Sequence, residues 1–210
     1  MDIWITKSMT KMLNKSYWED RYQNKEDFWN AKSITTPLKA YIDQLEDKSI
    51  HILVPGVGHG HELVYLHKQG FTESVGVDFT TIAFEQTIEN EPSISKDAVV
   101  IADFFQHQGK YDLILEQTFF CSLPVAKRKD YVQKMHELLQ PEGKLVGLLF
   151  DTTFEHDTPP YGGDKDEYLA LFEPYFTIEV MERAFNSIKP RQDRELFIIL
   201  KKKIWHKKSF

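Results

Sequence analysis

The chain has 210 residues, of which 41% are hydrophobic and 28% are charged, and its formal net charge is −6. These values are typical of one globular domain, and the acidic balance excludes a general nucleic-acid binder, which needs a dense basic surface. The single cysteine, Cys121, excludes an intramolecular disulfide and indicates a reducing compartment. No apolar run reaches membrane-spanning length, and the first residues lack the apolar core of a secretion signal. We therefore expect a cytoplasmic protein without a membrane partner.

The first part of the chain is predicted to be helical. Apolar residues recur at helical spacing over residues 8–22, and Pro37 suits the first turn of a second helix that ends near Leu45. Nothing in the composition marks a second domain. We therefore assign residues 1–210 to one domain, in which residues 1–47 form a helical extension that serves as a lid.

From residue 50 onward, short apolar runs alternate with helix-length segments. Strands are predicted at residues 50–54, 74–77, 98–102, 111–115 and 144–150, and helices at 60–68, 80–89, 125–139 and 164–172. Residues 141–143 are predicted to form a turn. Two further runs, 177–183 and 195–203, have no helix between them and should pair antiparallel. The pattern predicts a Rossmann-like α/β fold, with a mostly parallel seven-stranded sheet, helices on both faces and an antiparallel C-terminal hairpin.

A glycine-rich turn follows the first predicted strand. It reads Gly56-x-Gly58-x-Gly60 and continues with His61, where dinucleotide-binding loops carry a further glycine. The Gly-Lys-Ser/Thr ending of a triphosphate-binding loop is also missing. The spacing is more typical of loops that bind S-adenosylmethionine (SAM), which has no phosphate, and it disfavours a nicotinamide oxidoreductase. A tight turn without a ligand needs the same glycines, so the loop leaves that alternative open.

Acidic residues end three of the predicted strands. Asp78 ends the second strand, where a carboxylate can accept hydrogen bonds from both hydroxyls of a ribose. Asp103 and Phe104 follow the third strand and are expected beside an adenine. For Asp78, the N-cap of the next helix is the alternative role. Glu116 ends the fourth strand, and orienting a ligand and capping a loop remain equal alternatives for it.

Several short sequence motifs between about Tyr17 and Leu200 occur together in one order. They are Tyr17–Tyr22, Phe28–Trp29, Thr36–Leu38, Leu53–Glu62, Ala102–Phe105, Tyr111–Ile114, Thr118–Pro124, Pro160–Gly163, Pro190–Arg191 and Glu195–Leu196. Together they resemble the thiopurine methyltransferase family of class I SAM-dependent methyltransferases, which includes plant halide/thiol methyltransferases. The resemblance implies SAM as the cofactor, held by the N-terminal segment, the glycine loop and the strand ends. The implied contacts are Trp18, Tyr22, Trp29, Gly56, Gly58, Asp78, Asp103, Phe104 and Gln117.

Four positions depart from the family pattern. Val57 and His59 stand where cysteine and arginine are usual in the glycine loop, and Tyr22 replaces a tryptophan. We expect SAM binding to tolerate these changes. Asp193 stands where a glycine is expected, which leaves the preference for the methyl acceptor open.

Methyl transfer from a sulfonium is an in-line displacement, in which alignment and the exclusion of water supply most of the rate. Trp18, Tyr22, Phe28 and Trp29 are predicted to cover the cofactor as an aromatic lid, and ordinary packing on the core is the alternative. A thiol acceptor has a reference pKa of about 8.5 and therefore needs no strong general base.

The other reactive side chains receive simpler interpretations. Arg191 and Arg194 are the candidates for contact with an anionic acceptor, and surface charge is the alternative. Cys121 should pack as a small residue, because methyl transfer to a substrate needs no enzyme nucleophile. The spacing of His59 and His61 across a glycine turn does not indicate a metal site, so we expect solvent-facing histidines and no metal.

The sequence therefore predicts a SAM-dependent methyltransferase that acts on a small soft nucleophile, above all a thiol or thiopurine-like sulfur. A halide or a tellurium or selenium species stays open as the acceptor, because the acceptor pocket is built from variable segments. SAM binding without catalysis also stays open. The expected partner is a small-molecule methyl acceptor and no nucleic acid, and the expected state is a monomer.

Overall fold

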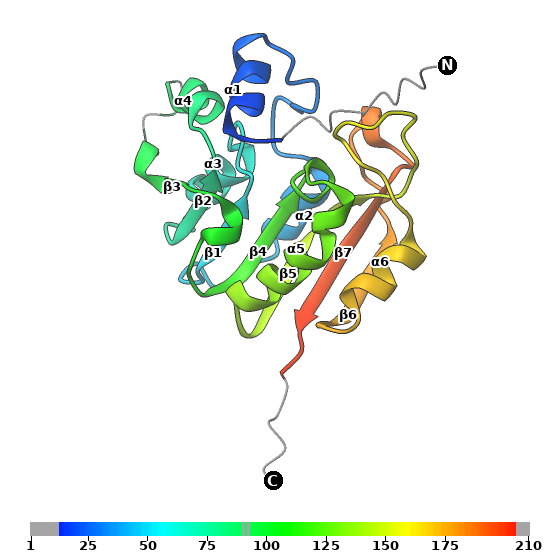
Figure 1. Cartoon of the computed structure of the whole chain (residues 1–210). Coiled ribbons are helices and arrows are strands. Elements are labelled where there is room, and N and C mark those ends of the chain that lie inside the picture. The colour runs from blue at the N-terminus through cyan, green and yellow to red at the C-terminus, as the bar shows by residue number, and fades with distance from the viewer. Residues whose placement is uncertain (1–12, 90, 92, 205–210) are drawn as a thin grey trace, which may run out of the picture.

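The frame of this computed structural model is a seven-stranded sheet in the order β3-β2-β1-β4-β5-β7-β6 (Figure 1). The structure describes residues 13–89, 91 and 93–204. The strands are β1 (Ile52–Pro55), β2 (Ser74–Asp78), β3 (Val99–Ile101), β4 (Tyr111–Gln117), β5 (Leu139–Phe150), β6 (Phe176–Arg183) and β7 (Glu195–Lys202). Neighbours among β1–β5 are parallel, whereas β7 is antiparallel to both β5 and β6. The predicted fold is confirmed.

Helices cover both faces of the sheet (Figure 1). They are α1 (Lys15–Gln23), α2 (Thr36–Ile42), α3 (His61–Lys68), α4 (Ile82–Ile88), α5 (Arg128–Leu138) and α6 (Lys165–Phe172). Side chains of α5 and α6 belong to one buried apolar cluster, and those of α2, α3 and α4 belong to a second. Among the described residues, no helix is both long enough and apolar enough to cross a membrane.

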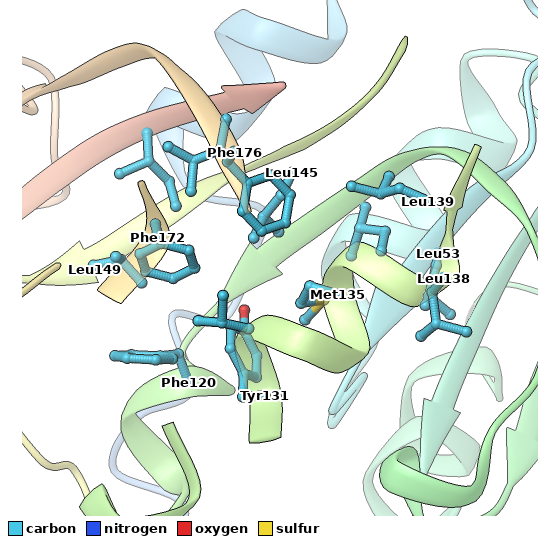
Figure 2. Packing of buried hydrophobic residues seen from close by; sticks show 14 of the residues in the cluster. Leu53, Phe120, Tyr131, Met135, Leu138, Leu139, Leu145, Leu149, Phe172 and Phe176 are labelled. Carbon is cyan, nitrogen blue, oxygen red and sulfur yellow. The ribbon is translucent and has the colours of Figure 1, made fainter. Parts of the chain in front are cut away.

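The central strands are apolar on both faces, which is why they were visible in the sequence as uninterrupted apolar runs. In β4, Ile114 belongs to the cluster under α5, while Leu113 and Leu115 belong to the cluster on the opposite face. Figure 2 shows the α5 side, where Phe120 and Tyr131 meet edge to face with their ring centres 4.9 Å apart. These two clusters fix the sheet, and so they fix the positions of the loops at its carboxyl edge.

The first helix begins later than predicted. Among the described residues α1 starts at Lys15, because the side chain of Asn14 accepts a hydrogen bond from the backbone N–H of Tyr17 at 3.1 Å and so caps the helix. The part of the prediction that covers residues 8–12 lies outside the described residues. The second helix also ends earlier than predicted, at Ile42.

The predicted turn at residues 141–143 is wrong, because these residues belong to β5. Leu139 pairs with Tyr111 and Lys144 pairs with Leu113, so the residues between Leu139 and Lys144 form an irregularity within a continuing strand. Glu142 takes a φ of +67° there. When turn-forming residues lie within one of two paired strands, they can form a bulge and leave the direction of the chain unchanged.

Candidate functional site

A cavity of about 500 Å³ lies at the carboxyl ends of the parallel strands, between the glycine loop and the N-terminal segment. Open α/β sheets bind ligands at this edge, and the volume lies in the usual range for small-molecule sites. All the residues predicted to hold the cofactor line it: Trp18, Tyr22, Trp29, Gly56, Gly58, Asp78, Asp103, Phe104 and Gln117. Arg191 and Arg194 line it as well. The structure thus brings the predicted residues together, while their individual contacts with a ligand stay predictions.

The glycine loop needs its glycines for the backbone itself. Gly56, Gly58 and Gly60 have φ values of +59°, +51° and +72°, in the left-handed region that side chains disfavour. A Cβ on Gly56 would lie 2.2 Å from the ring of Phe119, and one on Gly60 would lie 2.5 Å from the ring of Phe84. The turn therefore brings bare backbone to the cavity wall, and it does so before any ligand is considered.

The valine in this loop is a packing residue. Val57 is 4% exposed, and a Cβ on Gly76 of the neighbouring strand β2 would lie 2.8 Å from its Cγ2. The branched side chain fills the space that Gly76 leaves open. This contact accounts for Val57 at a position where the family usually has cysteine.

Asp78 holds the glycine loop and retains acceptor capacity. Its Oδ2 accepts from the backbone N–H of Gly58 at 2.9 Å, and its Oδ1 accepts from that of Thr80 at 3.2 Å. Burial raises the pKa of Asp78, and these backbone hydrogen bonds oppose part of the rise. A carboxylate offers about four acceptor positions, so two ribose hydroxyls can still be accommodated. The N-cap of α4 is Thr81, so the alternative role proposed for Asp78 is wrong.

Asp103 and Phe104 lie at the end of β3, on the same side of the cavity. Asp103 caps a short 3₁₀ turn, with its Oδ1 accepting from the backbone N–H of Phe105 at 2.9 Å. Its other oxygen is left for a ligand. Phe104 is 4% exposed and packs edge to face on Phe119, with ring centres 5.0 Å apart. The pair combines an acceptor with an apolar wall, which suits an adenine.

Glu116 caps the loop after β4. Its Oε1 accepts from the backbone N–H groups of Phe119 at 2.8 Å and Phe120 at 2.9 Å, and its Oε2 accepts from the Tyr131 hydroxyl at 2.6 Å. Of the two roles left open for Glu116, the structure supports the cap. The next residue, Gln117, lines the cavity and accepts a hydrogen bond from the Thr35 hydroxyl at 2.7 Å.

The aromatic residues of the N-terminal segment form one cluster above the glycine loop. Trp29 meets Trp18 and Tyr22 with ring centres 5.6 Å and 5.7 Å apart, and Tyr22 lies 5.8 Å from the ring of His59. Phe28 differs from the prediction, because 85% of it is exposed at the edge of the cavity. The cluster is therefore made of Trp18, Tyr22 and Trp29, and its role as a cover for the cofactor stays a prediction.

The prediction that His59 and His61 face solvent is wrong. His59 Nε2 donates to Asp27 Oδ2 at 2.7 Å, and His61 Nε2 donates to Asn30 Oδ1 at 2.9 Å. Asn30 Nδ2 donates in turn to Asp27 Oδ2 at 2.9 Å, and the two imidazoles are stacked with centres 5.7 Å apart. Burial and the neighbouring His59 lower the pKa of His61 to about 4, so its imidazole is neutral at pH 7.

This network, which we call the latch (Asp27, Asn30, His59 and His61), ties the N-terminal segment to the glycine loop. Local spacing gave no sign of it, because the partners are about thirty positions apart in the chain. His59, which stands where the family usually has arginine, is one of its members. Among the described residues, no group of three or more histidines, cysteines or acids is placed to hold a metal.

The two candidate arginines lie in different surroundings. Arg191 is 7% exposed, its Nη2 donates to the carbonyl of Trp29 at 2.6 Å, and its Nη1 lies 3.6 Å from Glu195 Oε1. Arg194 is exposed, and its guanidinium lies 5.0 Å from the ring centre of Phe154 at the outer part of the cavity. Arg191 is thus buried and held by Trp29, although no described residue accepts a hydrogen bond from its Nη1, whereas Arg194 is accessible.

Two further predictions concern the same region. Asp193 has a φ of +61°, which accounts for the glycine expected there, since aspartate is one of the few residues that tolerate this conformation. Cys121 is buried, and its thiol donates to the carbonyl of Thr118 at 3.2 Å. Burial raises the pKa of the Cys121 thiol, so it stays neutral and packs as expected.

The sequence model described as Thiopurine S-methyltransferase (TPMT) matches residues 13–208. Thiocyanate methyltransferase 1 of Brassica oleracea is 26% identical over 199 residues, which cover 91% of this chain and 87% of that protein. Thiopurine S-methyltransferase of Acinetobacter baylyi is 23% identical, over 81% of this chain and 88% of that protein.

A solved structure has a similar fold. It is a 1,6-didemethyltoxoflavin-N1-methyltransferase of Burkholderia thailandensis with bound 1,6-didemethyltoxoflavin and S-adenosylhomocysteine. The TM-score is 0.72 at 18% identity, and the match covers 90% of this chain and 87% of that chain. At this identity the likeness concerns the fold alone.

Proposed function

The chain belongs to the thiopurine S-methyltransferase family of SAM-dependent methyltransferases, and from this premise we propose that its methyl acceptor is a thiol or another small sulfur nucleophile. The observation that carries the proposal is the mixed lining of the cavity. It combines the glycine loop and strand-end carboxylates with apolar residues and the accessible Arg194, and we call the apolar residues near Arg194 the acceptor chamber.

We propose that the nucleoside end of the cofactor lies at the ends of β2 and β3. Asp78 would accept from the ribose hydroxyls, for which its carboxylate retains capacity, and Asp103 with Phe104 would enclose the adenine. SAM supplies a methyl group on a positively charged sulfur. The residues of the chain then have to align the two reactants and exclude water.

We propose that the extension predicted over residues 1–47 acts as a lid through its described part, residues 13–47, with Trp18, Tyr22 and Trp29 as its cover. Aromatic faces attract a cation and repel water, and this cluster lines the cavity opposite the glycine loop. The latch and the Arg191 hydrogen bond to Trp29 hold the cover in place. Alignment therefore depends on contacts that join distant parts of the chain.

The acceptor chamber suits a soft nucleophile. Its wall includes the apolar residues Leu123, Pro124, Phe150, Phe154, Pro159 and Pro160. Arg194 at its outer part would favour the thiolate over the thiol, whose reference pKa is about 8.5. Arg191 remains a second candidate for this contact. An apolar wall costs a weakly hydrated, polarisable anion less hydration free energy than a hard, strongly hydrated one, and it therefore favours soft acceptors.

A panel of acceptors tests the proposal. Initial rates of methyl transfer from SAM are measured with thiophenol, hydrosulfide, thiocyanate and a thiopurine, and compared with iodide, selenite and tellurite. The expected result is the highest kcat/KM for a sulfur acceptor. Turnover of iodide or a metalloid without turnover of any sulfur compound would contradict it. Calorimetric binding of SAM with no turnover on any acceptor would favour a binding protein without catalysis.

A further inference from the structure

Glu62 is a buried carboxylate that nothing so far accounts for. It lies in the first turn of α3, directly after the glycine loop, and it is 8% exposed. It lines the cavity. Within the described part of the chain, its carboxylate accepts a hydrogen bond only from its own backbone N–H. A carboxylate at a cavity wall with almost no partner in the protein offers free acceptor positions to a ligand.

The other buried glutamates differ from Glu62, because other residues of the chain donate hydrogen bonds to them. Glu116 accepts hydrogen bonds from two backbone N–H groups and from the Tyr131 hydroxyl. Glu195 accepts from the Ser187 hydroxyl at 2.7 Å and lies 3.6 Å from Arg191. No other described residue donates a hydrogen bond to Glu62, and it alone of the three lines the cavity.

The electrostatic surroundings of Glu62 carry a surplus of negative charge. Burial raises the pKa of Glu62 to about 7, although Arg191 lowers it in part. The Arg191 guanidinium also interacts with Glu195. Glu62 lies close enough to Glu116 to raise the pKa of Glu116. Cys121, which also faces these groups, is a neutral thiol. Glu62 and Glu195 thus share one guanidinium, with Glu116 close to Glu62, and a cation beside Glu62 would offset this negative charge.

The position of Glu62 agrees with one particular cation. Asp78 and Asp103 lie at the ends of β2 and β3, on the nucleoside side of the cavity. Glu62 interacts instead with Arg191, which precedes β7, and with Glu116 in β4, on the other side of β1. An elongated nucleoside cofactor that starts at Asp78 reaches this side with its other end.

We propose that Glu62 binds the α-ammonium group of the amino-acid portion of SAM. The inference rests on the proposed placement of the nucleoside at Asp78 and Asp103. An ammonium group offers three N–H donors to a carboxylate that has almost none. Arg191 then acts as a positioning residue, which holds Trp29 and Glu195 around this end of the cavity.

The proposal predicts a proton balance. At pH 7 a fraction of the Glu62 carboxyl groups carries a proton, and this proton leaves to solvent when the carboxylate pairs with the ammonium of the ligand. Binding of a ligand with the ammonium therefore releases up to one proton per site, whereas binding of a nucleoside without it releases none from Glu62.

The test compares S-adenosylhomocysteine (SAH), which carries the ammonium but no sulfonium charge, with 5′-methylthioadenosine, which lacks the amino-acid portion. Isothermal titration calorimetry at pH 7 in phosphate and in Tris gives affinities and proton release for the wild type, Glu62→Gln and Glu73→Gln. Glu73 is an exposed glutamate in the turn before β2 and serves as the control. We expect Glu62→Gln to weaken SAH binding at least tenfold, to leave methylthioadenosine within twofold, and to abolish the proton release seen with SAH.

Equal weakening of both ligands by Glu62→Gln, or unchanged SAH affinity, would overturn the proposal. The wild type alone provides an independent test should the variant fail to fold. Proton release with SAH that equals the release with methylthioadenosine between pH 6 and 8 also overturns it. Failure of the wild type to bind either ligand would instead refute the placement of the cofactor on which the inference rests.

Discussion

Removing the carboxylate of Asp27 should open the latch while the rest of the fold stays intact. Asp27 accepts from His59 at 2.7 Å and from Asn30 at 2.9 Å, and the His59 and Asp27 side chains are only 14% and 18% exposed. Burial alone would raise the pKa of Asp27, but the hydrogen bonds from Asn30 and His59 outweigh it and lower the pKa. The carboxylate is therefore charged at pH 7 and binds its partners as an anion.

The size of the effect follows from these contacts. A hydrogen bond to a charged group contributes ~1.5–3 kcal/mol, and 1.4 kcal/mol corresponds to about a tenfold change in an equilibrium constant. Asp27→Ala should therefore raise the population of the open form by ~10- to 100-fold. Because the segment that carries Trp29 covers the cavity, the dissociation rate of SAH should rise by the same factor.

Stopped-flow displacement of SAH measures this rate, and thermal unfolding checks the fold. Asp130→Ala is the matched control, because Asp130 forms an exposed ion pair with Lys127 at 2.9 Å, outside the cavity. A double-mutant cycle with His59→Ala should show that the two changes are not additive. A dissociation rate within twofold of the wild type for Asp27→Ala, or fully additive effects in the cycle, would refute the latch.

Four further outcomes are expected. Asp78→Ala should weaken SAM binding by ~1–3 kcal/mol in calorimetry, and unchanged affinity would limit Asp78 to holding the loop. Burial raises the pKa of Glu62 from 4.5 to about 7, so the contribution of Glu62 to the free energy of unfolding is complete below pH 4.5 and is lost as the pH rises through 7. In urea unfolding, the free energy of unfolding of Glu62→Gln should fall by ~3 kcal/mol less than that of the wild type over this pH range, and parallel pH profiles of the two proteins would contradict this expectation. Asp193→Gly should raise the free energy of unfolding by ~0.5–1 kcal/mol, because glycine adopts a φ of +61° without strain. A decrease would show that the Asp193 carboxylate itself stabilises the fold. Arg194→Gln should raise KM for a thiolate at pH 7 several-fold with little change in SAM affinity, and an unchanged KM would leave Arg191 as the candidate.

The parallel part of the fold could be predicted because its strands are buried on both faces. Runs such as Ile52–Pro55 are apolar at every position, and the glycines after them are required by the backbone. The residues that line the cavity were predictable for the same reason, since parallel strands end at one edge and bring Asp78 and Asp103 together. At these positions the residue types and the order of the strands predict the same structure.

The predictions that failed depend on contacts between distant segments. The orientation of His59 and His61 is decided by Asp27 and Asn30, and no local pattern reveals that pairing. The turn expected at residues 141–143 was overridden by pairing of β5 with β4. Turn propensity is a local quantity, and in this strand the register of the sheet decided against it.

The departures from the family pattern fit the backbone of the cavity wall at which we propose the cofactor to bind. Val57 fills the space above Gly76, and His59 binds Asp27. Asp193 tolerates the left-handed backbone that its position requires. Each substitution keeps the backbone course that the site needs, and none removes a carboxylate from the cavity.

We therefore expect differences in acceptor preference to come from the apolar wall of the acceptor chamber. That wall is formed by the loop between β5 and α6, which carries Phe154, Pro159 and Pro160, together with Arg194 before β7. Because this loop contributes little to the sheet, its side chains can change without disturbing Asp78 or the latch. Exchanging residues 154–160 for the corresponding loop of a relative should therefore move the ratio of kcat/KM between thiol and iodide while SAH affinity stays constant. A change in SAH affinity of the same size would show that the two ends of the cavity are not independent.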